Sequence, residues 1–234
     1  MTAIIIDTET TSLDKPEVIE LAYLGPLDTP LTAADPGVQL QFKPSVAISL
    51  GAMCTHHIID EDLDGCDPWP GLWEPPVGVT YLVGHNVDFD WKAIGSPNVK
   101  RICTLALARM VWPSIDSYSL GALIYHLYPH GMARKMVRGA HSALIDVELC
   151  NRVLFSLVDA LQPRNWEHLW QISEKARIPT RFTFGKYGPR DGQKGTPIGE
   201  VRRSDPGYIR WCLTSCDIVT NDPYWQKALR GEAA

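Results

Sequence analysis

The sequence has no long hydrophobic segment. Across its 234 residues, no apolar run approaches the roughly 20 residues that a membrane-spanning helix needs. The first apolar run, residues 3–6, meets an acidic residue at Asp7, which is too early for the core of a signal peptide. We therefore expect a cytoplasmic protein with no membrane partner.

Cysteine is sparse, and its spacing fits no metal or redox motif. None of the six cysteines forms the C-x-x-C pair of a zinc ribbon or a disulfide oxidoreductase. The neighbours Cys54, His56, His57 and Cys66 also lack standard ligand spacing, which favours a loop over a metal site. Internal repeats are absent too, and 45% hydrophobic with 21% charged residues excludes a disordered or fibrous chain.

An excess of positive charge is missing as well. Lysine and arginine number 22 against 27 acidic residues, and this total disfavours a nucleic-acid partner. The two halves differ, however: residues 1–100 carry 15 acids and 4 bases, whereas residues 101–234 carry 12 acids and 18 bases. The first half is suited to holding cations, and the second to holding a polyanion.

The basic excess is densest near the end of the chain. Residues 175–210 contain nine bases and three acids, interleaved with aromatic residues such as Tyr187 and Tyr208. Cations mixed with aromatic rings are typical of surfaces that bind single-stranded nucleic acid. The alternative is a small packing module in which the turn Phe184-Gly185-Lys186 is structural.

The pattern of apolar residues predicts strands that alternate with helices. Strands are expected at residues 3–6, 18–24, 38–42, 81–84 and 99–103. Helices are expected at residues 104–111, 119–127, 142–161, 166–175 and 206–213. Residues 60–79 are expected to form a long loop with room for a short helix. Residues 130–139 are basic and show no helical or strand periodicity. We predict an α/β fold, with a first domain over 1–162 and a small basic module over 163–234.

Two carboxylates follow the first strand. Because side chains alternate along a strand, Asp7 and Glu9 face one side and Thr8 faces the other. Converging carboxylates repel one another unless a cation lies between them, and oxygen ligands suit Mg²⁺ or Mn²⁺. A solvated strand end is the alternative, since D-x-E alone is weak evidence.

Two further segments carry acidic residues at helix starts. In His85-Asn86-Val87-Asp88-Phe89-Asp90, either aspartate is a candidate ligand, and Asn86 is a candidate helix cap. In the third segment, His141 and Asp146 are five residues apart. They cannot share a helical face unless His141 lies in the preceding loop and folds back.

Together these motifs resemble those of the DEDDh 3′→5′ exonucleases. D-x-E, H-N-x-x-F-D and H-x-A-x-x-D occur in that family's order, which assigns Asp7, Glu9, Asp90, His141 and Asp146 to its five catalytic positions. Residues 18–21, 52–58 and 102–105 agree further. Residues 102–113, with the tail segments 182–187 and 205–211, are similar to the exodeoxyribonuclease X family of bacteria.

The resemblance implies a ribonuclease H-like fold, a mixed five-stranded sheet flanked by helices. It also implies two Mg²⁺ ions, replaceable by Mn²⁺, with Asp7 bridging both. Glu9 and Asp146 would complete one ion's ligands, and Asp90 would act directly or through a water molecule. His141 would be the general base.

The resemblance implies substrate contacts too. Leu13 matches an apolar residue that packs on the terminal base. The other implied contacts near the carboxylates are Thr8, Thr10, His56, Asn86 and Phe89. For a surface that follows the strand, the candidates are Lys186, Tyr187, Arg190 and Arg210.

The reaction that the resemblance implies is 3′→5′ hydrolysis of DNA to nucleoside 5′-monophosphates. The substrates would be single-stranded DNA and duplex ends. The enzyme would be a monomer or homodimer in the cytoplasm of a bacterial or phage-infected cell. The rivals are an RNA exonuclease of the same superfamily, a proofreading subunit and a non-catalytic nucleic-acid-binding adaptor. The catalytic residues do not report on the 2′-hydroxyl. A complete set of five speaks against the adaptor.

Overall fold

The computed structural model describes residues 2–30 and 37–232. The chain forms two compact units, residues 1–173 and 174–234, and each is described by itself. The division falls inside α7 (Trp166–Ala176). The assignment of catalysis to residues 1–162 and of a separate role to 163–234 stays a prediction.

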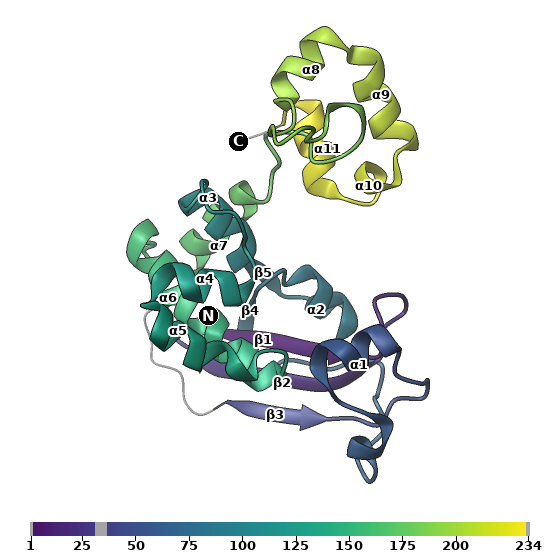
Figure 1. Cartoon of the computed structure of the whole chain (residues 1–234), viewed down its shortest axis with the longest axis vertical. Helices are drawn as coiled ribbons and strands as arrows, with labels where there is room; N and C mark the ends of the chain where they lie inside the picture. Colours follow the sequence, from purple (N-terminus) through teal and green to yellow (C-terminus); the bar gives the residue numbers. More distant parts are fainter. Residues whose placement is uncertain (1, 31–36, 233–234) are drawn as a thin grey trace. The chain divides into compact units, whose positions relative to one another are not determined.

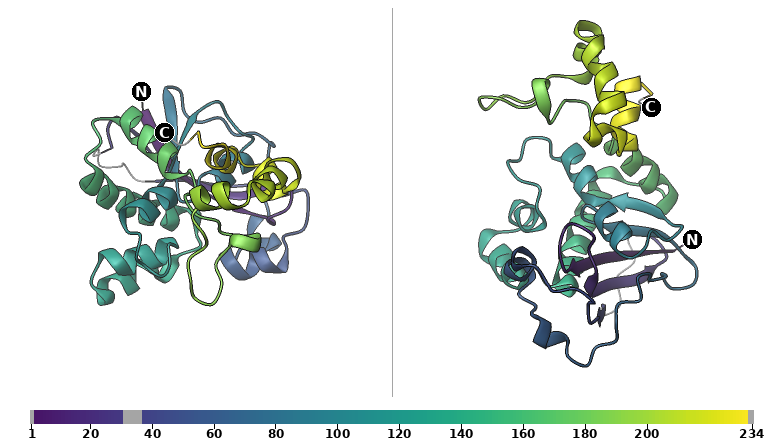
Figure 2. Two further views of the ribbon diagram at one scale, coloured as in Figure 1. Left: turned by 90° about the horizontal axis from the view of Figure 1, so that it is seen from above. Right: turned by 90° about the vertical axis from the view of Figure 1, so that its right-hand side faces the viewer.

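The first unit is built on a mixed five-stranded sheet of order β3-β2-β1-β4-β5. Its strands lie side by side (Figures 1 and 2), and their bounds are β1 Thr2–Thr10, β2 Val18–Leu27, β3 Val38–Gln41, β4 Val79–Gly84 and β5 Lys100–Cys103. The β1–β2 and β2–β3 pairs are antiparallel, whereas β1–β4 and β4–β5 are parallel. This is the mixed sheet that the sequence predicted.

The helices of the first unit surround this sheet. Their bounds are α1 Leu50–His56, α2 Asp88–Ala93, α3 Thr104–Val111, α4 Leu120–Leu127, α5 His130–Met136 and α6 Ala143–Leu161, with short 3₁₀ turns at Asp60–Leu63 and Val137–Gly139. The long helix α6 packs on β1, β2 and β3.

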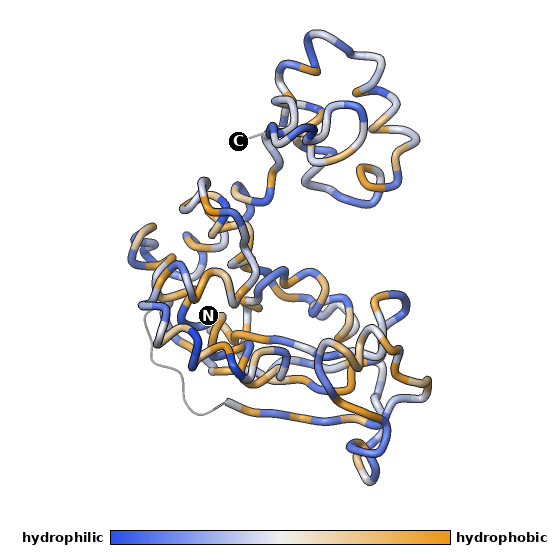
Figure 3. Tube along the Cα trace, viewed as in Figure 1, coloured by the Kyte–Doolittle hydropathy of each residue, from blue (hydrophilic) through white to orange (hydrophobic). Residues whose placement is uncertain are grey.

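Burial of apolar residues along β1 and on one face of α6 holds the unit together. Ala3 to Ile6 of β1 are fully buried, and so are Val147 and Val153 of α6. Figure 3 colours the trace by hydropathy and shows apolar and polar residues interspersed along the chain. α7 is tied to the sheet because Trp166 Nε1 donates to the Leu27 carbonyl at 3.0 Å. The predicted core strand and core helix are therefore confirmed.

Two sequence interpretations are wrong. The segment around Cys54 is helix α1, not a loop, because Ser49 caps it by accepting a hydrogen bond from the Ala52 amide. Residues 130–139 are not irregular: α5 and a 3₁₀ turn occupy them, and only Ala133 of α5 is buried. One buried residue leaves too weak a pattern for a sequence argument to detect.

The second unit contains α8 Ile198–Ser204, α9 Pro206–Ser215, α10 Asp217–Thr220, α11 Pro223–Arg230 and a 3₁₀ turn at Gly185–Tyr187. Its core includes Phe182, Val201, Cys212 and Trp225. It therefore has a hydrophobic core of its own.

Over the described residues, 2–30 and 37–232, no helix is both long enough and apolar enough to cross a membrane.

Candidate active site

Asp7 and Glu9 lie near the end of β1. Both side chains are half-buried, whereas Thr8 between them is buried on the opposite side of the strand. Antiparallel pairing with β2 fixes this part of β1, where Asp7 is opposite Ala22 and Glu9 is opposite Glu20. Parallel pairing with β4 fixes residues 2–5, which come just before it. The strand thus presents two carboxylates from one face, as its alternation predicted.

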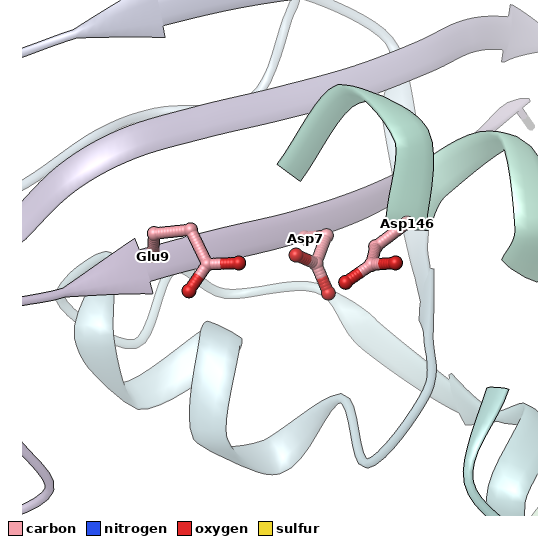
Figure 4. Close-up of side chains that lie close together, drawn as sticks. All are labelled: Asp7, Glu9 and Asp146. Carbon is pink, nitrogen blue, oxygen red and sulfur yellow. The ribbon is translucent and has the colours of Figure 1, made fainter. Parts of the chain in front are cut away.

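Asp146 joins these carboxylates from α6. One oxygen from each of Asp7, Glu9 and Asp146 lies within 4.8 Å of the other two. Figure 4 shows Asp7 between Glu9 and Asp146, with the first two on β1 and the third on the helix. Three carboxylate oxygens at this separation can hold a divalent cation.

Asp90 borders this group but is fixed differently. Its Oδ1 accepts hydrogen bonds from the Thr8 backbone amide at 3.0 Å and the Thr8 hydroxyl at 2.8 Å. Asp88, the rival candidate, instead pairs with Arg101 at 2.6 Å. Of the two aspartates, only Asp90 is buried next to Asp7.

The carboxylates raise one another's pKa values. Burial is the largest cause for each; it raises the pKa of Glu9 to about 8, and the charge of Asp146 adds to this. Burial likewise raises the pKa of Asp90 to about 7, although the hydrogen bonds from Thr8 oppose the shift. Burial and the charge of Asp90 also raise the pKa of Asp7. Without a cation, this site disfavours full ionisation.

His141 precedes α6 in an exposed turn. Its φ of 73° is left-handed, and its backbone amide donates to Asp146 Oδ2 at 3.2 Å. His141 thus lies in the loop before α6, as expected, and contacts Asp146 through its backbone; the role of its ring stays a prediction. Asn86 also has a left-handed φ, of 70°, so it forms a turn before α2 and does not cap that helix.

His85 also lies beside the carboxylates, yet both of its ring nitrogens make hydrogen bonds. Nε2 lies 2.7 Å from the Tyr118 carbonyl, which can only accept, so Nε2 carries the proton and Nδ1 accepts from Thr104 Oγ1 at 3.0 Å. Burial lowers the pKa of His85 to about 4. This imidazole is neutral near pH 7 and has no free nitrogen to accept a proton.

Two adjoining pockets open beside the carboxylates. One, of about 280 Å³, is lined by Asp7, Thr8, Glu9, Leu13, His85, Asn86, Phe89, Asp90 and Asp146. The other, of about 450 Å³, is lined by Thr8, Glu9, Thr10, Ser12, Leu13, Ser49, Gly51, Ala52, Thr55, His56 and Phe89. The residues predicted to contact substrate near the carboxylates all line these two pockets: Thr8, Thr10, Leu13, His56, Asn86 and Phe89. Their contact with substrate stays a prediction.

Leu13 and His56 are the most unusual residues of the pocket walls. Leu13 is 88% exposed although its side chain is apolar. His56 is buried; its Nδ1 accepts from the Ile58 amide at 3.0 Å, so the neutral ring carries its proton on Nε2. Among the described residues, Nε2 of His56 has no hydrogen-bond partner of standard geometry, although it interacts with the Thr10 backbone. Burial lowers the pKa of this histidine, and the Thr10 backbone opposes the shift.

The four residues predicted to follow the strand lie in the second unit and fall into two pairs. Lys186 and Tyr187 both donate to Asp205 Oδ2, at 2.7 and 2.9 Å, and Tyr187 packs against the core. Asp205 also caps α9 through the Tyr208 amide. Lys186 and Tyr187 thus stabilise the 3₁₀ turn against α9, whereas Arg190 and Arg210 are exposed.

Sequence reasoning gave no role to two features of the first unit. The first is Glu20 of β2, a buried acid whose charge raises the pKa values of Asp7 and Glu9. It lies in residues 18–21, which resemble the family, but its partners depend on strand register. The second is the exposed basic segment Arg134, Lys135 and Arg138, which ends three residues before His141. The sequence showed the charge of this segment and not its helix.

The sequence was compared with known proteins. No protein-family model matches it. The chain is 32% identical over 219 residues to Exodeoxyribonuclease 10 of Escherichia coli strain K12, a match that covers 92% of each chain. A second strain, O6:H1, carries a protein of the same name with the same identity and coverage.

Solved structures agree on the fold. Exonuclease X in complex with 5′-overhanging duplex DNA superposes with a TM-score of 0.58 at 26% identity, over 73% of this chain and 99% of that chain. The zinc-bound ExoI–single-stranded DNA complex of E. coli superposes with a TM-score of 0.56 at 18% identity, over 76% and 45% of the two chains. Such neighbours confirm the predicted ribonuclease H-like fold. With a relative of 32% identity over nearly its whole length, the chain belongs to the exodeoxyribonuclease X family and is a DNA exonuclease.

Proposed function

We propose that this DNA exonuclease removes nucleotides from 3′ ends and releases nucleoside 5′-monophosphates with the help of two divalent cations. Mg²⁺ is the expected ion, and Mn²⁺ a substitute. The observation that carries the proposal is the convergence of Asp7, Glu9 and Asp146, whose oxygens lie within 4.8 Å of one another. The 5′-overhanging duplex DNA bound to Exonuclease X supports DNA as the substrate.

The donor set fits divalent cations. It contains only carboxylate oxygens, the ligands that Mg²⁺ and Mn²⁺ prefer, and burial together with mutual repulsion disfavours it as a set of free anions. When bound, the cations would neutralise the scissile phosphate and lower the pKa of the attacking water. Asp7, Glu9 and Asp146 would hold the cations. Asp90, fixed by Thr8, would assist directly or through a water molecule.

We assign proton transfer to His141. It lies in an exposed turn and contacts Asp146 through its backbone amide. The alternative bases are less suitable, because both nitrogens of His85 are engaged and Nδ1 of His56 accepts a backbone hydrogen bond. His141 would accept the proton of the attacking water as a general base.

The pocket bordered by Leu13, His56 and Phe89 would hold the terminal nucleotide. Its volume of about 450 Å³ lies in the usual range of small-ligand sites, about 300–1,000 Å³. Exposed Leu13 would pack on the terminal base. The Nε2 proton of His56 would bond an acceptor on the base, N3 of a purine or O2 of a pyrimidine. Because every base offers such an acceptor, this contact would not select sequence. Thr10 and Asn86 would line the sugar and phosphate side.

Two groups of basic side chains would bind the phosphate backbone of the DNA. Arg134, Lys135 and Arg138 are exposed in the same unit as the carboxylates, and Arg138 is three residues from His141. In the second unit, Arg190 and Arg210 are the exposed candidates, whereas Lys186 and Tyr187 support that surface through Asp205.

End-labelled substrates test the proposal. The protein is incubated with 3′- and 5′-labelled single-stranded DNA, duplex DNA and RNA, each with Mg²⁺, with Mn²⁺ and with EDTA. We expect mononucleotides from the 3′ end of DNA with either cation and no cleavage in EDTA. Release from the 5′ end, or undiminished cleavage in EDTA, would overturn it. Faster hydrolysis of RNA would favour an RNA exonuclease instead.

A further inference from the structure

One buried carboxylate beside the site has no role in the reaction as proposed. Glu20 lies on β2 and is only 3% exposed. In the β1–β2 register it is the direct partner of Glu9, so both side chains project from the same face of the sheet. An acid buried this deeply needs hydrogen-bond donors or a cation.

The partners of Glu20 are all neutral N–H groups. Its Oε1 accepts from Gln39 Nε2 at 2.6 Å and Gln41 Nε2 at 3.3 Å, both on β3. Its Oε2 accepts from the backbone amide of Ala143 at 2.7 Å. Glu20 therefore links the edge of the sheet to the first residue of α6.

The start of α6 has no cap of its own. Ser142 is the N-cap residue, but its side chain accepts no hydrogen bond from the helix. The first amides of a helix lack intrahelical acceptors, and an anion there is also favoured by the helix dipole. Glu20 supplies both the acceptor and the negative charge, from a strand more than 120 residues earlier in the chain.

The link between Glu20 and Ala143 is important because residues of the site lie on both sides of Ala143. Asp146 lies in the first turn of α6, and His141 lies two residues before Ala143. A displacement of this helix start would move Asp146 relative to Asp7 and Glu9, which the sheet holds in place.

We propose that Glu20 is a positioning residue: by capping α6 from β2, it sets the distance between Asp146 and the two carboxylates of β1. This inference rests on the proposed cation-dependent reaction. Glu20 does not contact the cations in this proposal and acts only through the helix.

The first test compares two substitutions with a matched control. Glu20→Ala removes the acceptor, and we expect kcat to fall at least tenfold and the affinity for Mn²⁺, measured without DNA, to fall several-fold. Glu20→Gln keeps a carbonyl oxygen that accepts from the Ala143 amide. The side-chain amides of Gln39 and Gln41 can rotate so that a carbonyl oxygen accepts from the new amide group. We therefore expect Glu20→Gln to retain most of the kcat and of the Mn²⁺ affinity. Glu148→Ala removes an exposed acid from α6 itself and should stay within about twofold of the unaltered protein.

A double-mutant cycle separates positioning from general loss of structure. In an Asp146→Asn background, Glu20→Ala should cause no further loss of Mn²⁺ affinity, because the residue it positions no longer carries a charge. Additive losses would overturn the inference, as would a Glu20→Gln protein as impaired as Glu20→Ala.

A third variant serves if Glu20→Ala does not fold. Ala143→Pro removes the amide that Glu20 accepts from, at the first helical position, where proline is compatible with a helix. It should reproduce the Mn²⁺ and kcat losses, and unchanged values would contradict the proposal. Failure of this inference can be told apart from failure of the proposed function. If the unaltered protein shows no cation-dependent cleavage, the proposed function is refuted. If the unaltered protein is active but the losses in the double-mutant cycle are additive, only the role of Glu20 is refuted.

Discussion

At the scale of single residues, the site depends on a few side chains whose partners leave them little freedom. Asp90 is held by both donors of Thr8, and His85 by Thr104 and Tyr118. His141 differs because its ring is exposed and its backbone is left-handed. The residue assigned to proton transfer is thus the one histidine of this pair with an accessible ring.

Replacing His141 should abolish most turnover. We expect His141→Ala to lower kcat by about 100-fold or more, the usual contribution of a general base, while Mn²⁺ affinity is mostly kept. His141→Asn is the second variant, because asparagine tolerates a left-handed backbone better than alanine. His130→Ala, at an exposed position of α5, is the control. An unchanged pH–rate profile in either His141 variant would show that another group is the base.

The hydroxyl of Thr8 should matter separately from its backbone. Thr8→Val keeps the shape and the amide but removes the bond of 2.8 Å to Asp90. We expect a stability loss of about 1 kcal/mol in denaturant unfolding and a severalfold lower kcat. Thr2→Val removes a hydroxyl bond to the Gly78 carbonyl at the far end of the same strand and should leave kcat unchanged. Equal kcat losses in both variants would point to a general effect on β1.

Residue chemistry was only partly predictable from the sequence. Asp7 and Glu9 followed from strand alternation, but the choice of Asp90 over Asp88 needed the family resemblance. The structure gives the physical difference, a pairing of Asp88 with Arg101. The family resemblance included Glu20 in residues 18–21 but gave it no role, because its contact with Ala143 joins residues that no local pattern relates.

At the scale of elements, the long periodic segments were predictable and the short ones were not. α6 was expected over 142–161 and spans Ala143–Leu161, since its buried residues recur every three or four positions. α1 and α5 have seven residues each and bury one residue apiece, so their patterns are too weak to read. Short helices of this kind depend on caps and tertiary contacts more than on periodicity.

α5 provides the prediction that belongs to this scale. Replacing Arg134, Lys135 and Arg138 together by alanine should weaken the binding of single-stranded DNA in EDTA. It should also reduce the slope of log affinity against log salt by about 0.7 per lost phosphate contact. Arg152→Ala removes one exposed cation from α6 and is the matched control. An unaltered slope in the triple variant would remove this segment from the path of the strand.

At the scale of the whole molecule, the carboxylates make stability depend on pH and cations together. In the cation-free protein, the pKa of Glu9 is raised from 4.5 to about 8 and that of Asp90 from 3.8 to about 7. The folded state therefore holds more protons than the unfolded state between these values, so stability falls as pH rises from about 4 to about 8.

This dependence is measurable as a melting temperature. In EDTA, we expect Tm to decrease over that pH range, and Mg²⁺ to raise it most at pH 8, where the site is most ionised. Asp7→Asn should raise the Tm in EDTA at pH 8 and reduce the gain from Mg²⁺. A Tm in EDTA that rises steadily toward pH 8 would contradict the assigned shifts.

The crowding of Asp7, Glu9 and Asp146 has a last consequence, for the surroundings of the enzyme. An acid that retains its proton until a cation displaces it makes loading of the site a chemical exchange, in which the cation enters as protons leave. The heat of loading should then depend on the ionisation enthalpy of the buffer. The proposed site would also bind divalent cations less tightly as the pH falls, so cation-dependent cleavage should weaken in acid.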